Sequence, residues 1–214
     1  MTHRLTPVLA RLAGVTAVAA LAIACTAAPA APSPAPSASA GSGGGTCPTA
    51  QPAPLAAGET RTVTITTELG SMTIKIEADL SPIAAGNFVA LADCGFYDGV
   101  VFHRVVPDFV IQGGDPTGSG GGGPGYTIQD EPVTTVYQRG TVAMARTGAP
   151  NSVGSQFFIV LDESARDALA SYNTYQIIGS VTDGMETADR IAGAADAELP
   201  SDPVAMTDVS VSKP

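Results

Sequence analysis

The sequence predicts a mostly β fold, a closed β-barrel capped by two α-helices, for the larger part of the chain. Many short segments rich in Val, Ile, Thr and Phe are separated by Gly, Pro, Asn and Asp. Only two segments have helical spacing together with end signals. The 214 residues include 24 glycines and no tryptophan, which suits a turn-rich β fold. An open sheet would expose unpaired strand edges, and this favours closure.

The predicted strands begin with a hairpin. Residues 60–67 and 70–77 alternate polar and apolar side chains on either side of a short turn at Glu68-Leu69-Gly70. Further strands are predicted wherever a similar short run recurs, at 100–106, 109–113, 126–129, 140–146, 155–161, 175–181 and 208–213.

Two helices are predicted. The first spans about residues 82–93, with Ser81 as N-cap, Pro82 at the first helical position and Gly95 after the end. Gly86 inside it weakens the helix. The second spans about residues 185–192.

Residues 1–24 have the pattern of an export signal. Arg4 and Arg11 precede an apolar run that ends in small residues at Cys25. The stretch LAIAC resembles a bacterial lipobox, so we expect Cys25 to be lipidated and the protein to be anchored at the outer face of the cell membrane. Ala22-Ile23-Ala24 also fits ordinary cleavage, which leaves soluble secretion as the alternative.

Residues 25–58 are predicted to be a disordered tether, followed by one folded domain over 59–214. The tether consists largely of Ala, Pro, Ser and Gly, which bury too little surface to offset the entropy of ordering. If Cys25 carries lipid, Cys47 and Cys94 remain as a pair that could form a disulfide in an oxidising compartment. Two free thiols are the alternative.

Charge and motifs exclude several functions. The formal charge of −10, which becomes −12 when Arg4 and Arg11 are removed, disfavours nucleic acid as a partner. No CxxC is present and one histidine remains after cleavage, so no metal site is predicted. The glycine-rich run 118–125 lacks the lysine of a phosphate loop and is predicted to be a surface loop. GxSxG is also missing.

Two long segments, FHRVVPDFVIQGGD at 102–115 and GTVAMARTGAPNSVGSQFFIV at 140–160, closely resemble the cyclophilin family of peptidyl-prolyl cis-trans isomerases. The resemblance covers about residues 60–213. It implies an eight-stranded antiparallel barrel with two helices, proline-containing polypeptides as partners, and no cofactor. We expect a monomer.

The resemblance implies a role for each matching residue. Arg104 takes the place of the family's catalytic arginine, and Gln112 that of the glutamine that binds the substrate backbone. The positions implied to surround the substrate are Phe109, Val110, Gln112, Ala145, Arg146, Gln156, Phe158, Leu169 and Tyr175.

Some of these residues depart from the family pattern. Arg146 replaces a common asparagine, and it either contacts acidic substrates or is solvated. Leu169 falls near the position of an absent pocket-edge tryptophan, and Tyr175 replaces a common histidine. Without the resemblance, Phe109 and Phe158 would be read as ordinary core residues, and Arg104 as a surface charge.

Strand alternation adds an expectation about His103. If Arg104 and Phe102 face the substrate, His103 and Val105 face away, so His103 is expected to be a hydrogen-bonded structural residue. The sequence therefore predicts a prolyl isomerase that acts on exported proteins. A module that binds proline segments with little turnover is the alternative, and a purely structural envelope protein is disfavoured by the combination of Arg104, Gln112 and the two phenylalanines.

Overall fold

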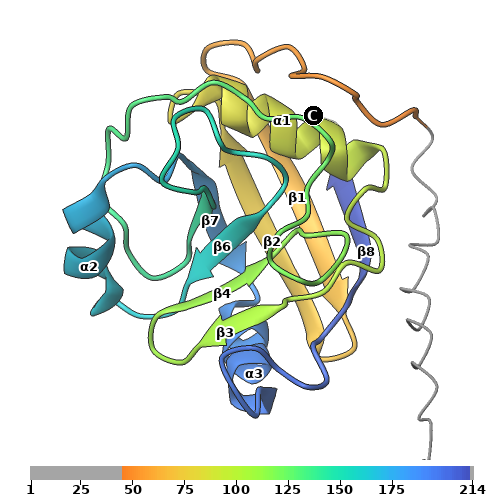
Figure 1. Cartoon of the computed structure of the whole chain (residues 1–214), viewed down its shortest axis with the longest axis vertical. Helices are drawn as coiled ribbons and strands as arrows, with labels where there is room; N and C mark the ends of the chain where they lie inside the picture. Colours follow the sequence, from red (N-terminus) through yellow and green to blue (C-terminus); the bar gives the residue numbers. More distant parts are fainter. Residues whose placement is uncertain (1–44, 213–214) are drawn as a thin grey trace, which may run out of the picture. The chain divides into compact units, whose positions relative to one another are not determined.

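Eight strands form one antiparallel sheet in the computed structural model, which describes residues 45–212 (Figure 1). The sheet order is β3-β4-β6-β5-β7-β2-β1-β8. The strands are β1 (Thr60–Thr67), β2 (Gly70–Glu77), β3 (Arg104–Val106), β4 (Val110–Gly113), β5 (Thr141–Met144), β6 (Phe157–Val160), β7 (Ile177–Asp183) and β8 (Met206–Ser212). The helices are α1 (Pro82–Asp93), α2 (Ala165–Tyr172) and α3 (Met185–Ala194).

The sheet is a half-barrel, so the predicted closed barrel is wrong. Within the described residues, its edges β3 and β8 share no ladder, and one isolated bridge joins Val101 to Ala205 between them. β3 has only three residues, and the loop that follows α3 lies along its outer edge, where the Val105 N–H donates to the Glu198 carbonyl at 2.8 Å. A loop therefore covers the edge that closure would have paired.

Most predicted elements are confirmed, with three differences. The hairpin and both predicted helices form, but α2 is a third helix that the sequence did not suggest, because only Ala165 and Leu169 of its eight residues are buried. Residues 126–129 form no strand, and Ile128 makes a single bridge to Val153. The strand predicted over 100–106 begins only at Arg104.

The N-terminus of α1 is capped from a distance. In the described chain Ser81 makes no capping hydrogen bond through its side chain, contrary to the prediction. The Glu131 carboxylate instead accepts hydrogen bonds from the backbone N–H groups of Ile83 and Ala84, both at 2.9 Å. A carboxylate here satisfies two otherwise unpaired donors and is favoured by the helix dipole.

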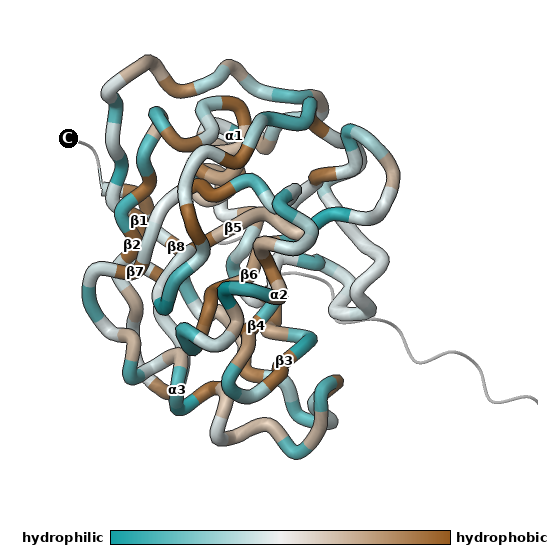
Figure 2. Tube along the Cα trace, turned by 90° about the vertical axis from the view of Figure 1, so that its left-hand side faces the viewer, coloured by the Kyte–Doolittle hydropathy of each residue, from teal (hydrophilic) through white to brown (hydrophobic). Residues whose placement is uncertain are grey.

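Two apolar clusters lie on opposite faces of the central strands. Figure 2 shows apolar (brown) segments beside the labels of β4 and β6. All four residues of β5 and of β6 are buried. In β6, Phe157 and Ile159 belong to the main core, whereas Phe158 and Val160 belong to the second cluster beside α2. Burial on both faces explains the continuous apolar run of this strand, and the second cluster forms the floor of the candidate site.

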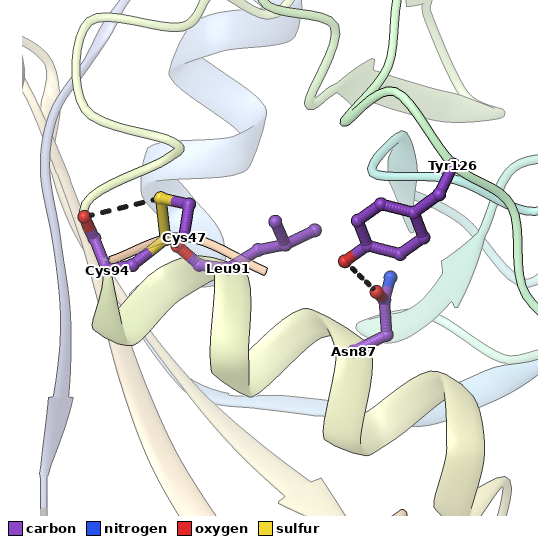
Figure 3. Close-up of a disulfide and its surroundings, with 5 residues drawn as sticks. All are labelled: Cys47, Asn87, Leu91, Cys94 and Tyr126. Carbon is purple, nitrogen blue, oxygen red and sulfur yellow. Dashed lines mark hydrogen bonds between the residues drawn. A yellow bond between two sulfur atoms is a disulfide. The ribbon is translucent and has the colours of Figure 1, made fainter. Parts of the chain in front are cut away.

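Residues 47–56 form a strap along α1, so this part of the predicted disordered tether is ordered (Figure 1). Near the C-terminal end of α1, Cys47 is joined to Cys94 by a disulfide with Cα atoms 5.2 Å apart (Figure 3). Near the N-terminal end, the Leu55 N–H donates to the Pro82 carbonyl at 3.1 Å. The cross-link and the backbone hydrogen bond compensate for the strap's small apolar content.

Gly86 of α1 lies directly beneath the strap. A Cβ at this position would approach the Ala53 carbonyl oxygen to 2.5 Å. The glycine that weakens the helix in isolation is therefore required for close packing of the strap.

Several predictions fall on residues outside the described range. They are the export signal over 1–24, the lipidated Cys25 and the tether over 25–44. Within residues 45–212, no helix combines the length and apolar character needed to cross a membrane.

Candidate functional site

One row of directly paired residues runs across four strands and carries the candidate site. Arg104 of β3 pairs with Gln112 of β4, Gln112 pairs with Phe158 of β6, and Phe158 pairs with Ala143 of β5. Side chains in such a row point to the same face of the sheet. The fold thus places a cation, an amide and an aromatic ring side by side.

This row opens into a cavity of about 400 Å³, which we call the proline cavity after the ring that the resemblance implies it would hold. Nine of the ten predicted catalytic and substrate-binding residues line it, all except Gln156, together with two further residues, Ala168 and Tyr172. Its lining is Arg104, Phe109, Val110, Gln112, Ala145, Arg146, Phe158, Ala168, Leu169, Tyr172 and Tyr175.

The wall opposite β3 comes from α2 and the residues that follow it. Leu169 is buried and lines the cavity, while the neighbouring Tyr172 is 68% exposed at the rim. The Tyr175 ring packs edge-on against Phe158 with centroids 5.4 Å apart. This wall gives the cavity an apolar side facing the polar groups of Arg104 and Gln112.

Tyr137 fixes the position of Tyr175. The Tyr137 hydroxyl donates to the Tyr175 carbonyl at 3.0 Å and accepts from the Tyr175 N–H at 3.2 Å. Burial raises the pKa of Tyr137 to about 12, so the hydroxyl keeps its proton near neutral pH. The hydrogen bonds between the Tyr137 hydroxyl and the backbone of Tyr175 therefore fix the position of the aromatic wall.

Gln156 connects the proline cavity to a second cavity of about 550 Å³ beneath the glycine-rich loop. Its side-chain oxygen accepts from Gln112 Nε2 at 3.0 Å, and its own Nε2 donates to the carbonyls of Gly120 and Gly122 at 3.0 and 2.9 Å. Gln156 lines only this second cavity, so it orients Gln112 and does not face the proline cavity.

Asn87 of α1 supports the far wall of the second cavity (Figure 3). Its Oδ1 accepts from the Tyr126 hydroxyl at 2.7 Å, and its Nδ2 donates to the Gly154 carbonyl at 2.8 Å. Both Tyr126 and Gly154 line that cavity. Helix α1 therefore packs against the strap through Gly86 and supports the lining of the second cavity through Asn87.

Arg146 is held by intramolecular contacts, so it is not the solvated side chain that one of the two alternatives from the sequence describes. Its Nη1 lies 3.1 Å from Asp130 Oδ1, and its Nη2 donates to the Ala149 carbonyl at 2.8 Å. Only 12% of its side chain is exposed. Arg146 lies between the two cavities and lines both, with its charge already paired.

Arg104 also has a charged partner, which no pattern in the sequence indicates. Its Nε donates to Glu198 Oε1 at 2.7 Å, and the side chains are 33% and 60% exposed. Glu198 lies 94 residues away, in the irregular loop between α3 and β8. No periodic pattern marks such a loop, so a long-range contact of this kind has no signal in the sequence.

His103 is buried but is not the hydrogen-bonded residue that the sequence predicted. It is 4% exposed, and neither ring nitrogen has a hydrogen-bond partner among the described residues. Burial lowers the pKa of His103, and the nearby Asp115 carboxylate partly opposes this shift. Phe102, expected to share the face of Arg104, lies in the main core because β3 begins only after it.

Within residues 45–212, no group of three or more His, Cys, Asp or Glu side chains gathers in a metal-binding arrangement. The proline cavity is lined by the guanidinium groups of Arg104 and Arg146, the carboxamide of Gln112 and mostly apolar side chains. Such a set can hold a small ring and donate hydrogen bonds beside it.

Comparisons with known proteins agree with this geometry. Residues 62–211 match the family described as cyclophilin type peptidyl-prolyl cis-trans isomerase/CLD. Peptidyl-prolyl cis-trans isomerase B of Bacillus subtilis is 44% identical over 124 residues, which are 55% of this chain and 83% of the relative. Peptidyl-prolyl cis-trans isomerase-like 2 of Cryptococcus neoformans is 40% identical over 135 residues, 60% of this chain.

The relatives differ in size. The chain spans 22% of the length of one longer curated relative and 23% of the length of the Cryptococcus neoformans protein. By contrast, it covers 99% of a solved cyclophilin type isomerase from Cryptosporidium parvum, with a TM-score of 0.65 and 32% identity over 73% of this chain. That protein was also solved in the presence of the dipeptide Ala-Pro.

Proposed function

Because the chain belongs to the cyclophilin-type peptidyl-prolyl cis-trans isomerase family, we propose that it accelerates rotation about X–Pro bonds in polypeptides. The observation that carries this proposal is the paired row of Arg104, Gln112 and Phe158 at the edge of the proline cavity. The row offers an apolar surface for a pyrrolidine ring, with two hydrogen-bond donors beside it.

The chemistry needs no covalent step. An X–Pro bond rotates over a barrier of roughly 18–20 kcal/mol because rotation breaks amide resonance. In the twisted state, the prolyl nitrogen regains its lone pair and can accept a hydrogen bond. A guanidinium directed at that nitrogen stabilises the twisted state more than the planar one, which lowers the barrier.

Each side chain has a separate task. Phe109, Val110 and Phe158 hold the ring, and Gln112 binds the backbone on one side of it, so the acyl group before proline is the part that rotates. Arg104 supplies the hydrogen bond, and arginine suits this because it stays charged and has a rigid planar tip.

The test is Arg104→Ala in an assay of cis-trans exchange in a short X–Pro peptide. We expect kcat/KM to fall at least about a hundredfold, as when a transition-state hydrogen-bond donor is removed. Arg61→Ala is the control, because Arg61 of β1 pairs with Glu59 and does not line the proline cavity, and it should retain full activity. Wild-type binding without exchange would point to a proline-binding module instead, and an active Arg104→Ala variant would refute the mechanism.

The place of action is proposed from the N-terminal sequence. The signal-like residues 1–24 and the lipobox-like stretch ending at Cys25 support export and lipid anchoring, and exported proteins would then be the clients. The Cys47–Cys94 pairing is compatible with an oxidising compartment. Mass spectrometry of the mature N-terminus would detect a diacylated Cys25; an unmodified N-terminus after cleavage would favour soluble secretion.

A further inference from the structure

The loop between α3 and β8 brings a carboxylate to the proposed catalytic arginine. Glu198 Oε1 accepts a hydrogen bond from Arg104 Nε at 2.7 Å. Among residues 45–212, Nε is the only guanidinium nitrogen of Arg104 that donates a hydrogen bond. The two Nη groups, which form the far end of the side chain, are left for another acceptor.

The backbone of Glu198 is itself fixed at the edge of the sheet. Its carbonyl accepts the N–H of Val105, the residue next to Arg104, at 2.8 Å. Farther along the loop, the Val204 carbonyl accepts the Phe102 N–H at 2.9 Å. The loop is thus attached to the chain on both sides of Arg104, one residue after it and two residues before it.

An internal contact also closes the loop around Glu198. The Asp196 carboxylate accepts hydrogen bonds from the N–H and hydroxyl of Ser201 at 3.0 and 2.6 Å. Pro200 further restricts the backbone within this turn. The carboxylate of Glu198 therefore projects from a constrained turn.

We propose that Glu198 is a positioning residue that orients the Arg104 guanidinium toward the proline cavity. This inference rests on the proposed isomerase function. An arginine side chain has many rotamers, and ordering one of them is costly. A charge-assisted hydrogen bond to Nε limits those rotamers while leaving both Nη groups available for the prolyl nitrogen.

A purely structural role fits the pair poorly. Both side chains are substantially exposed, and exposed ion pairs contribute little to stability. Removing Glu198 should therefore leave the fold and its thermal midpoint nearly unchanged. An effect on catalysis would then report the orientation of Arg104.

The experiment compares Glu198→Ala and Glu198→Gln with wild type in the full chain, using exchange in an X–Pro peptide to obtain kcat and KM. For Glu198→Ala we expect kcat/KM to fall roughly threefold to tenfold, mainly through kcat. Glu198→Gln should fall between it and wild type, because an amide oxygen still accepts from Nε without the charge.

The matched control is Glu77→Gln. Glu77 forms an exposed pair with Lys75 at 2.8 Å on β2, and this strand does not contribute to the proline cavity. It should match wild type in both kinetics and thermal midpoint.

A double-mutant cycle with Arg104→Ala distinguishes failure of the positioning role of Glu198 from failure of the proposed isomerase function. If Glu198 acts through Arg104, then Glu198→Ala should cause no further loss in the Arg104→Ala background. An unchanged or raised kcat/KM for Glu198→Ala, or an equal loss in both backgrounds, would overturn the inference while leaving an Arg104-dependent isomerase in place. An inactive wild type would remove the proposed function and this inference with it.

Discussion

Gly86→Ala tests whether the strap over residues 47–56 packs against α1 as the structure shows. The substitution adds one methyl group on the helix surface that faces the strap. That methyl carbon would lie 2.5 Å from the Ala53 carbonyl oxygen and 3.1 Å from both the Leu55 nitrogen and the Pro54 Cα. All three are backbone atoms, so no side-chain rotation relieves the contact.

Two opposing terms set the expected change. Alanine is favoured over glycine inside a helix by about 1 kcal/mol. Overpacking against a fixed backbone costs about 1–3 kcal/mol, and the Cys47–Cys94 disulfide keeps the strap from moving away. We therefore expect Gly86→Ala to lower the free energy of unfolding by up to about 2 kcal/mol.

The assay is urea unfolding of the oxidised protein, with the same substitution repeated in a variant that lacks residues 1–57. Without the strap, only the helix term remains, and Gly86→Ala should become stabilising by up to about 1 kcal/mol.

Gly193→Ala provides the matched control, since a Cβ at this glycine of α3 meets nothing within 4 Å. It should be stabilising in both backgrounds. If Gly86→Ala stabilises the intact protein as Gly193→Ala does, the strap does not pack as described.

Two further predictions concern the disulfide and His103. The disulfide spans 47 positions, so replacing both cysteines by serine should lower the free energy of unfolding by about 4 kcal/mol in the chain-entropy description; equal urea midpoints for the variant and wild type would contradict this. Burial lowers the pKa of folded His103 below its unfolded value near 6.5, so the unfolded state binds more protons and stability should fall as pH decreases below that value. His103→Gln should flatten urea-derived stability between pH 7 and 5, and identical pH slopes for both proteins would refute the assignment.

Much of the candidate site could be predicted from short-range patterns. The run FHRVVPDFVIQG predicts two short strands, and their antiparallel pairing is enough to place Arg104 opposite Gln112. The run FFIV at 157–160 contains two alternating apolar faces, and one of them supplies Phe158 to the cavity. Local alternation decides where these side chains lie, whereas their roles at the site are implied only by the resemblance to the cyclophilin family.

Other features depend on contacts that local patterns do not encode. The strap has the composition of a disordered segment, yet a disulfide and hydrogen bonds to distant residues hold it in place. The cap of α1 likewise comes from Glu131, almost 50 residues after the helix begins. Gly86 is the local feature that indicates the strap, because glycine destabilises a helix interior and is typical of positions where another backbone approaches closely.

The open edge of the sheet at β3 is the reason that Glu198 can reach Arg104. A closed barrel would pair β3 directly with β8, and a strand would then occupy the outer edge of β3. The loop after α3 lies there instead, and its Glu198 carbonyl takes the Val105 N–H that a paired strand would have bound. The loop can also send a long acidic side chain across that edge to Arg104. The same short β3 that leaves the barrel open thus gives Arg104 access to an orienting carboxylate.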